Sequence, residues 1–109
     1  MTEFFDVRSG NVNGALVITV SGEVDVAGET QFVRHVVDGV GTTDAQRVVL
    51  DLSRVAFMDS TGLRMLLLCK RRAEERGIPM TLSITADGPV SRLIDVSGVA
   101  EMFQLERMG

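Results

Sequence analysis

The sequence predicts an α/β fold in a single domain, with a mixed, mostly parallel sheet of about four strands and helices packed on it. Two observations support this prediction. Segments rich in β-branched residues alternate with helical patterns in the order β-β-α-β-α-β-α, which favours parallel strands joined by right-handed crossovers. The 109 residues are 45% hydrophobic and 24% charged, which suits about one domain with a buried core. We expect this domain to span residues 1–109, with an ordered core from about 5 to 104.

The first two strands are expected to form an antiparallel hairpin with a short turn. Residues 5–8 alternate apolar and charged side chains, as in a half-exposed edge strand. Residues 11–14 read Asn-Val-Asn-Gly, a turn signal, and residues 15–20 are mostly apolar and β-branched, as in a more buried strand. Ser21 and Gly22 are expected to end this second strand. The hairpin makes the sheet mixed rather than purely parallel.

A helix and a buried strand are expected next. Apolar residues recur at helical spacing between about residues 27 and 40, which predicts one apolar helix face. This face consists of Val33, Val36, Val37 and Val40, with Phe32 beside it. Gly39 and Gly41 are expected to close the helix. Residues 47–52 contain a short apolar run that is typical of a buried parallel strand.

The remaining elements follow from their end signals. A second helix is expected from about residue 60 to 76, because Gly77 and Pro79 form a common stop signal. A strand over residues 80–84 and a third helix over 90–96 follow, and Gly98 breaks that helix. A short helical turn is expected over residues 99–103. We expect the residues after Gln104 to be frayed.

Charge and composition argue against several classes of partner. The net charge is -4, and the basic cluster at residues 70–72 is followed at once by Glu74 and Glu75, so we expect no direct nucleic-acid binding. The longest apolar run, residues 65–69, is too short to span a bilayer, so no membrane association is expected. A single cysteine and an N-terminus without a signal-peptide pattern predict a cytoplasmic protein.

Catalytic and metal-binding patterns are poorly supported. The one histidine, His35, lies off the apolar helix face and has no partners for a zinc site. Cys69 lies in an apolar helical run and is expected to act as a small buried hydrophobe. Asp51 and Asp59 flank the end of a strand as paired carboxylates; alternatively, Asp59 caps the next helix and Asp51 ties down a loop. No phosphate-binding glycine motif occurs, so we expect no cofactor, no metal and no enzymatic activity.

The turn from Asp59 to Gly62 is the most informative feature. Asp59 or Ser60 can cap the following helix by accepting a backbone hydrogen bond, and Gly62 allows another backbone element to approach closely. A helix N-terminus tolerates an anion, so a phosphate on Ser60 is compatible with the fold. The helix is apolar on several sides. Leu63 or Met65 either lies near Ser60 as an apolar contact or fills the core.

Residues 48–63, which read VVLDLSRVAFMDSTGL, resemble the central motif of STAS domains, specifically of bacterial anti-sigma factor antagonists. Residues 20–25 resemble the Gly-Glu-x-Asp segment of this family, and residues 88–99 resemble its C-terminal helix and the following turn. The resemblance extends over roughly residues 5–104. It implies a single STAS-like domain.

The resemblance also implies a mechanism. The unphosphorylated antagonist would bind an anti-sigma factor that is a serine kinase and so release a sigma factor, and a serine phosphatase would reset it. By position the phosphorylated residue is Ser60, with Thr61 as the alternative acceptor. The expected partner-binding residues are Glu23, Asp25, Asp59, Ser60, Thr61, Gly62, Leu63 and Met65. The protein is expected to be a monomer or a weak dimer.

Two other classes of function stay open at this point. The chain is alternatively a STAS subunit or sensor module of a stress-signalling scaffold or a lipid-transport complex. A third hypothesis is that the protein is an enzyme that uses Asp51, Asp59 and Ser60, but the sequence offers no base and no metal site to support such an enzyme.

Overall fold

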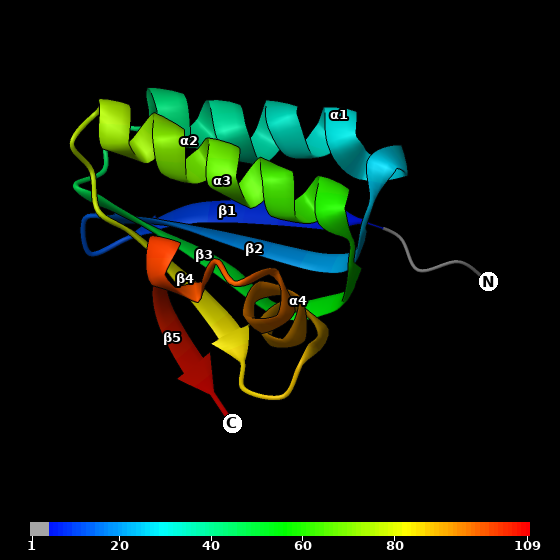
Figure 1. The fold of residues 1–109 in the computed structure, drawn as a ribbon. Helices are drawn as coiled ribbons and strands as arrows, with labels where there is room; N and C mark the ends of the chain where they lie inside the picture. Colours follow the sequence, from blue (N-terminus) through cyan, green and yellow to red (C-terminus); the bar gives the residue numbers. More distant parts are fainter. Residues whose placement is uncertain (1–4) are drawn as a thin grey trace.

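One five-stranded sheet organises the molecule, in the order β1-β2-β3-β4-β5 (Figure 1). The computed structural model describes residues 5–109. Strand β1 runs antiparallel to β2, and the other neighbouring pairs are parallel. This confirms the mixed, mostly parallel sheet, with one strand more than expected. The strands are β1 (Asp6–Val12), β2 (Ala15–Val24), β3 (Arg47–Met58), β4 (Met80–Thr85) and β5 (Gln104–Met108).

The predicted hairpin is present and its turn has two residues. Asn13 and Gly14 both have positive φ, 50° and 81°, as a turn that follows the twist of the strands requires. Val12 pairs with Ala15 across the turn, so β1 continues well beyond the predicted residues 5–8. Most of β1 is exposed, which fits an edge strand.

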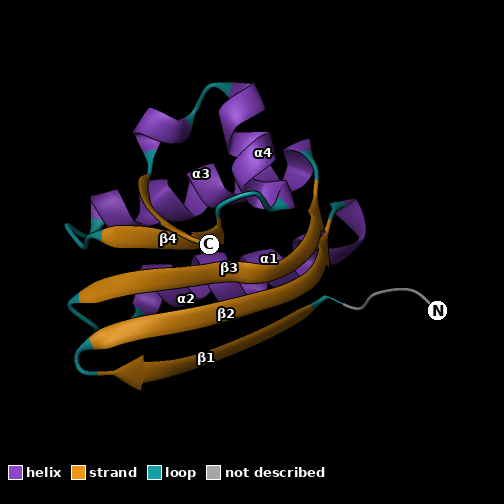
Figure 2. Cartoon of the chain, turned by 90° about the horizontal axis from the view of Figure 1, so that it is seen from below, coloured by secondary structure: helices purple, strands orange, loops and turns teal. Residues whose placement is uncertain are grey.

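Helices cover one face of the sheet. The α-helices are α1 (Glu29–Phe32), α2 (Asp38–Thr42), α3 (Ser60–Glu75) and α4 (Pro89–Ser97). Figure 1 shows α1, α2 and α3 over the sheet, and Figure 2 shows the opposite face of β1, β2 and β3 without helices. Because side chains alternate along a strand, Leu16, Ile18 and Val20 of β2 all point into the core beneath the helices.

The first helical segment differs from the regular helix predicted over residues 27–40. It begins with the 3₁₀ turn η1 (Val26–Gly28), passes through the π-helical segment η2 (Val33–Val37) between α1 and α2, and ends at Thr42. Gly39 and Gly41 therefore lie inside the last turns and do not close the helix. The predicted apolar face holds: Phe32, Val36, Val37 and Val40 are buried and Val33 is half-buried.

Strands β2 and β3 are longer than predicted. They were expected to end near Ser21 and Leu52, but they continue to Val24 and Met58. The pairing shifts register twice, between Thr19 and Ser21 and between Gly22 and Glu23 of β2. Each shift adds a residue to β3 and breaks the strict alternation of apolar and polar side chains, so the pattern resembles a loop.

The C-terminus is a strand, contrary to the frayed tail predicted after Gln104. Strand β5 pairs in parallel with β4, and Leu105 lies beside Leu82. Arg107 also holds β5 to α4, since its guanidinium donates two hydrogen bonds to the Asp95 carboxylate, at 2.8 and 3.2 Å. The remaining predictions hold closely: α3, β4, α4 and a 3₁₀ turn η3 (Ala100–Met102) lie where expected.

Candidate functional site

The carboxyl ends of β2 and β3 lie side by side and form one edge of the sheet. Val24 pairs with Met58, and the Asp59 backbone N–H donates to the Val24 carbonyl at 3.4 Å. Asp25 and Asp59 thus follow adjacent strand ends, and each begins a helical segment. We call this region, residues 23–26 and 57–63, the strand-end surface. The structure therefore brings most of the predicted partner-binding residues to one place.

Asp59 is the N-cap of α3, and Ser60, the other capping candidate, is the first residue of the helix. Its Oδ1 atom accepts hydrogen bonds from the backbone N–H groups of Thr61 at 3.0 Å and Gly62 at 3.3 Å. Its own carbonyl accepts from the Leu63 N–H at 3.1 Å. The carboxylate satisfies two of the N–H groups that a helix start leaves unpaired, and its charge also suits the helix dipole.

The two hydroxyl residues after Asp59 differ in accessibility. Ser60 is the first residue of α3 and is exposed, whereas Thr61 is half-buried. An enzyme that modifies a side chain must reach its hydroxyl oxygen. The difference in exposure therefore favours Ser60 over Thr61 as an acceptor.

Gly62 packs the first turn of α3 tightly against the two strand ends. A Cβ atom on Gly62 would lie 2.5 Å from Met58 Cγ and 3.1 Å from the Val24 carbonyl oxygen. Only a residue without a side chain fits there. Gly62 is buried, so its place in the site is to position Ser60 rather than to offer a contact surface.

Leu63 and Met65 fall on different sides of α3. Leu63 is half-buried, whereas Met65 is only 2% exposed and belongs to the core with Leu66 and Cys69. Met65 was predicted as a partner contact, and this placement removes it from the surface. Its side chain points toward the sheet because residues 62, 65, 66 and 69 share one helix face.

Two exposed apolar residues at this edge were missed by the sequence analysis. Val26 in η1 is 69% exposed, and Phe57 in β3 is 46% exposed. Phe57 pairs with half-buried Glu23 immediately after the second register shift. The strand was expected to end near Leu52, so Phe57 had no predicted place in the sheet. In the structure the two one-residue shifts together restore the original alternation, so Met58 is buried like Leu50 and Leu52, and Phe57 faces outward. Val26 follows the capping residue Asp25, which accepts from the Ala27 N–H at 3.0 Å.

A family model described as STAS domain matches residues 7–108. The chain belongs to the STAS domain family. It is 27% identical over 92 residues to the "Anti-sigma F factor antagonist" of Paenibacillus polymyxa, covering 84% of this chain and 78% of that protein.

Solved structures of anti-sigma factor antagonists share this STAS fold. One from Mycobacterium paratuberculosis has a TM-score of 0.75 at 24% identity, with 94% of this chain and 85% of that chain covered. The Bacillus cell fate determinant SpoIIAA in its phosphorylated form has a TM-score of 0.69 at 20% identity, with 97% and 92% covered.

This STAS domain holds its other chemistry-bearing residues apart. Asp51 lies in the middle of β3, where its Oδ1 accepts from the Ser53 hydroxyl at 2.6 Å and from the Ser53 N–H at 3.0 Å. It stabilises the strand at the first register shift rather than a loop, and it does not pair with Asp59. His35 is exposed. Burial raises the pKa of the Cys69 thiol to about 12, so the thiolate is disfavoured.

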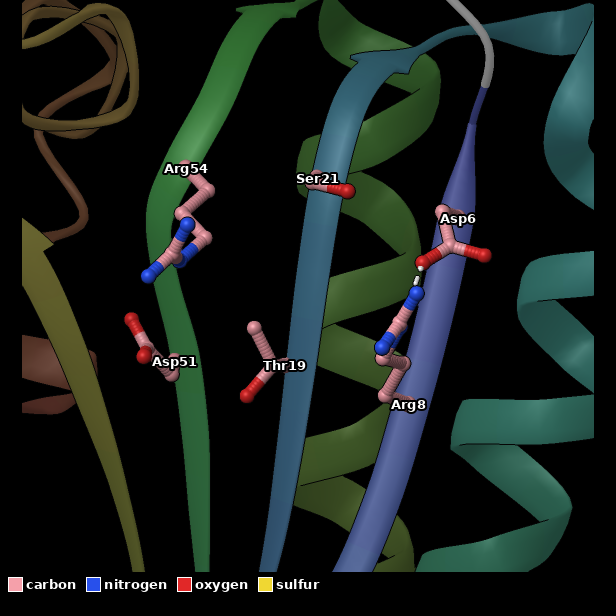
Figure 3. A pocket seen from close by; sticks show the side chains of 6 residues that line it. All are labelled: Asp6, Arg8, Thr19, Ser21, Asp51 and Arg54. Carbon is pink, nitrogen blue, oxygen red and sulfur yellow. Dashed lines mark hydrogen bonds and ion pairs between the residues drawn. The ribbon is translucent and has the colours of Figure 1, made fainter.

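The helix-free face of the STAS sheet carries a shallow polar pocket of about 600 Å³ (Figure 3). Arg8 and Asp6 of β1 form an ion pair there at 3.3 Å. Asp51 and Arg54 of β3 line the opposite side, so the pocket holds two acidic and two basic side chains. These formal charges cancel, and the pocket has no excess of either sign to select a charged ligand. Thr19 and Ser21 of β2 lie between the two pairs (Figure 3).

Two further observations concern metals and membranes. Across residues 5–109, no three His, Cys, Asp or Glu side chains gather in a way that could hold a metal ion. Within the same residues, no helix is both long enough and apolar enough to cross a bilayer.

Proposed function

We propose that this STAS protein is a cytoplasmic anti-sigma factor antagonist that acts by binding and not by catalysis. It binds an anti-sigma factor that is a serine kinase and so frees a sigma factor. Phosphorylation at Ser60 ends the complex, and a serine phosphatase restores the active form. The observation that carries the proposal is the exposed Ser60 at the first position of α3, directly after the capping residue Asp59.

The similarities support the general role. A curated relative bears the name of an anti-sigma F factor antagonist, and SpoIIAA, a protein of the same fold, has been solved in a phosphorylated form. Ser60 is the more exposed of the two adjacent hydroxyl residues, so we assign the phosphate to Ser60 rather than Thr61.

The charge of a phosphate explains how modification would end binding. A phosphoserine carries about -1.5 to -2 charge at pH 7. The Asp59 carboxylate already accepts hydrogen bonds from the N–H groups of Thr61 and Gly62, which neutralises part of the positive charge at the start of α3. A phosphate on Ser60 therefore gains less from the helix start and lies beside a like charge. Buried in an interface, it adds repulsion and a desolvation cost. A loss of about 3 kcal/mol lowers affinity roughly a hundredfold.

Because of the packing of Gly62, the repulsion and the desolvation cost of the phosphate weaken the complex and not the fold. The first turn of α3 has no room to move toward Val24 and Met58. Ser60 therefore stays at the surface in both states, and the added phosphate projects outward toward the partner rather than into the fold.

The test is an affinity capture from a lysate of the native host with four baits: wild type, Ser60→Ala, Ser60→Asp and Thr61→Val. Captured proteins are identified by mass spectrometry, and a captured kinase is then purified and incubated with the protein and ATP. We expect wild type, Ser60→Ala and Thr61→Val to retain the kinase, Ser60→Asp to lose it, and phosphate to appear on all baits with an intact Ser60.

Two results would contradict the proposal. One is a set of partners that does not change with the charge at residue 60. The other is a membrane transporter complex captured by every bait, which would favour the subunit role instead.

A further inference from the structure

Exposed apolar side chains stand at both strand ends beside Ser60. Val26 lies two residues after the end of β2, and Phe57 lies one residue before the end of β3. Phe57 pairs with Glu23 across the two strands, and Val26 is three positions after Glu23 in the chain. The Cα atoms of Val26 and Phe57 therefore lie within roughly 16 Å of each other. A standard interface buries about 800 Å² on each partner, so one partner surface can cover both.

The carboxylates at the same edge have no cationic partner of their own. Glu23, Asp25 and Asp59 form no ion pair within residues 5–109; Asp25 and Asp59 accept only backbone N–H groups. By contrast, nearby Glu29 is paired with Arg64 at 2.9 Å. The strand-end surface thus presents two large apolar groups among unpaired negative charges.

We propose that Val26 and Phe57 are the apolar anchors of the contact with the anti-sigma factor kinase, and that the kinase meets them with an apolar surface bordered by lysine or arginine side chains. This inference rests on the proposed function and adds the chemistry of the partner surface. Aromatic residues that become fully buried in an interface supply a large share of binding energy, and unpaired carboxylates gain from cations opposite them.

The anchors also account for the position of the switch. Phe57 precedes Asp59 by two residues, and Ser60 directly follows Asp59. Apolar anchors contribute to affinity only where water is excluded around them. A phosphate on Ser60 must keep its water, so its presence beside Phe57 holds that part of the interface open.

The experiment uses the purified kinase that phosphorylates Ser60 and measures its affinity for variants by calorimetry without ATP. Phe57→Ala is expected to raise Kd about tenfold or more, and Val26→Ala about threefold. The matched control is Val12→Ala. Val12 is 54% exposed but lies at the hairpin turn, at the opposite end of β2 from Val24, so its Kd should equal that of wild type.

The charge requirement is tested with Asp25→Asn, because asparagine keeps the cap on the Ala27 N–H and removes only the charge. We expect slower association with the kinase and a weaker dependence of the rate on salt than for wild type.

Two outcomes overturn the inference while leaving the proposed function intact. One is an unchanged Kd for Phe57→Ala and Val26→Ala while Ser60→Asp still abolishes binding. The other is an equal loss for Val12→Ala, which would show that the effect is not local. Absence of any kinase that modifies Ser60 overturns the proposed function itself. Thermal unfolding of each variant confirms that the fold is intact.

Discussion

Gly62 lies so close to Met58 that a Cβ atom at residue 62 would stand 2.5 Å from the Met58 Cγ atom. The contact joins the first turn of α3 to the end of β3 and so fixes the position of Ser60. Gly62→Ala should force the backbone or Met58 to move, which lowers the free energy of unfolding by about 1–3 kcal/mol. Urea denaturation measures this loss.

Gly39→Ala is the control for that substitution. Gly39 lies in α2, and a Cβ atom there meets nothing within 4 Å. Alanine favours a helix over glycine by about 0.5–1 kcal/mol, so this variant should be as stable as wild type or more stable. Equal losses for both glycines would show that packing at Gly62 is not the cause.

The cap on α3 gives a second prediction. Asp59→Ala removes the acceptor for the Thr61 and Gly62 N–H groups and should cost about 1 kcal/mol of stability. Asp59→Asn keeps an acceptor oxygen and should recover most of that loss. The denaturant midpoints of the two variants show whether the cap causes the loss of stability. An asparagine variant as unstable as the alanine variant would argue against capping.

The buried thiol of Cys69 predicts both low reactivity and a pH effect. Burial raises its pKa from 9.0 to about 12. In the native protein at pH 8, Cys69 should react with Ellman's reagent far more slowly than in urea. Because the unfolded chain loses the thiol proton near pH 9 and the folded chain keeps it, this contribution to stability is complete below pH 9 and falls as pH rises toward 12, by about 1 kcal/mol per unit.

Cys69→Ala separates that effect from other titrations. The variant should be less stable than wild type at pH 7, but its stability should fall less steeply above pH 9. The chain contains no tyrosine, so no phenol contributes in this range. Identical slopes for the two proteins would mean that the thiol titrates equally in both states.

The C-terminal strand provides the fourth prediction. Removal of residues 104–109 leaves one edge of β4 unpaired and takes away the partner of Asp95. We expect Tm to fall on the order of 10 °C, which for a domain of this size corresponds to about 2 kcal/mol. Self-association through the exposed edge should also appear in size-exclusion chromatography. A tail that is merely frayed would give an unchanged Tm.

Local signals were sufficient for much of the molecule. The Asn13–Gly14 turn, the Asp59 cap and the Gly77 stop all depend on residues near one another in the chain, and each lies where it was expected. The same holds for Gly98, whose φ of 71° ends α4. The Asp59-Ser60-Thr61-Gly62 turn was recognised for the same reason.

The features that the sequence did not predict depend on contacts between residues far apart in the chain. Strand β5 exists because β4 offers it an edge and α4 offers Asp95 to Arg107, and neither partner is near in sequence. Strand β3 continues to Met58 because β2 accepts two extra residues through shifts in register. This continuation of the strand places Phe57 on its outward side.

Residue order by itself was enough to establish the alternating α/β arrangement, the helix start at Ser60 and the absence of a glycine-rich phosphate-binding motif, because hydrophobic period, capping and turn chemistry act over a few residues. The tertiary structure alone decided which residues share the edge with Ser60. Glu23 and Phe57 meet there through pairing between two strands that are more than twenty residues apart in the chain, and Val26 follows the end of the first of them. Met65 is buried in the core because its helix face turns toward the sheet.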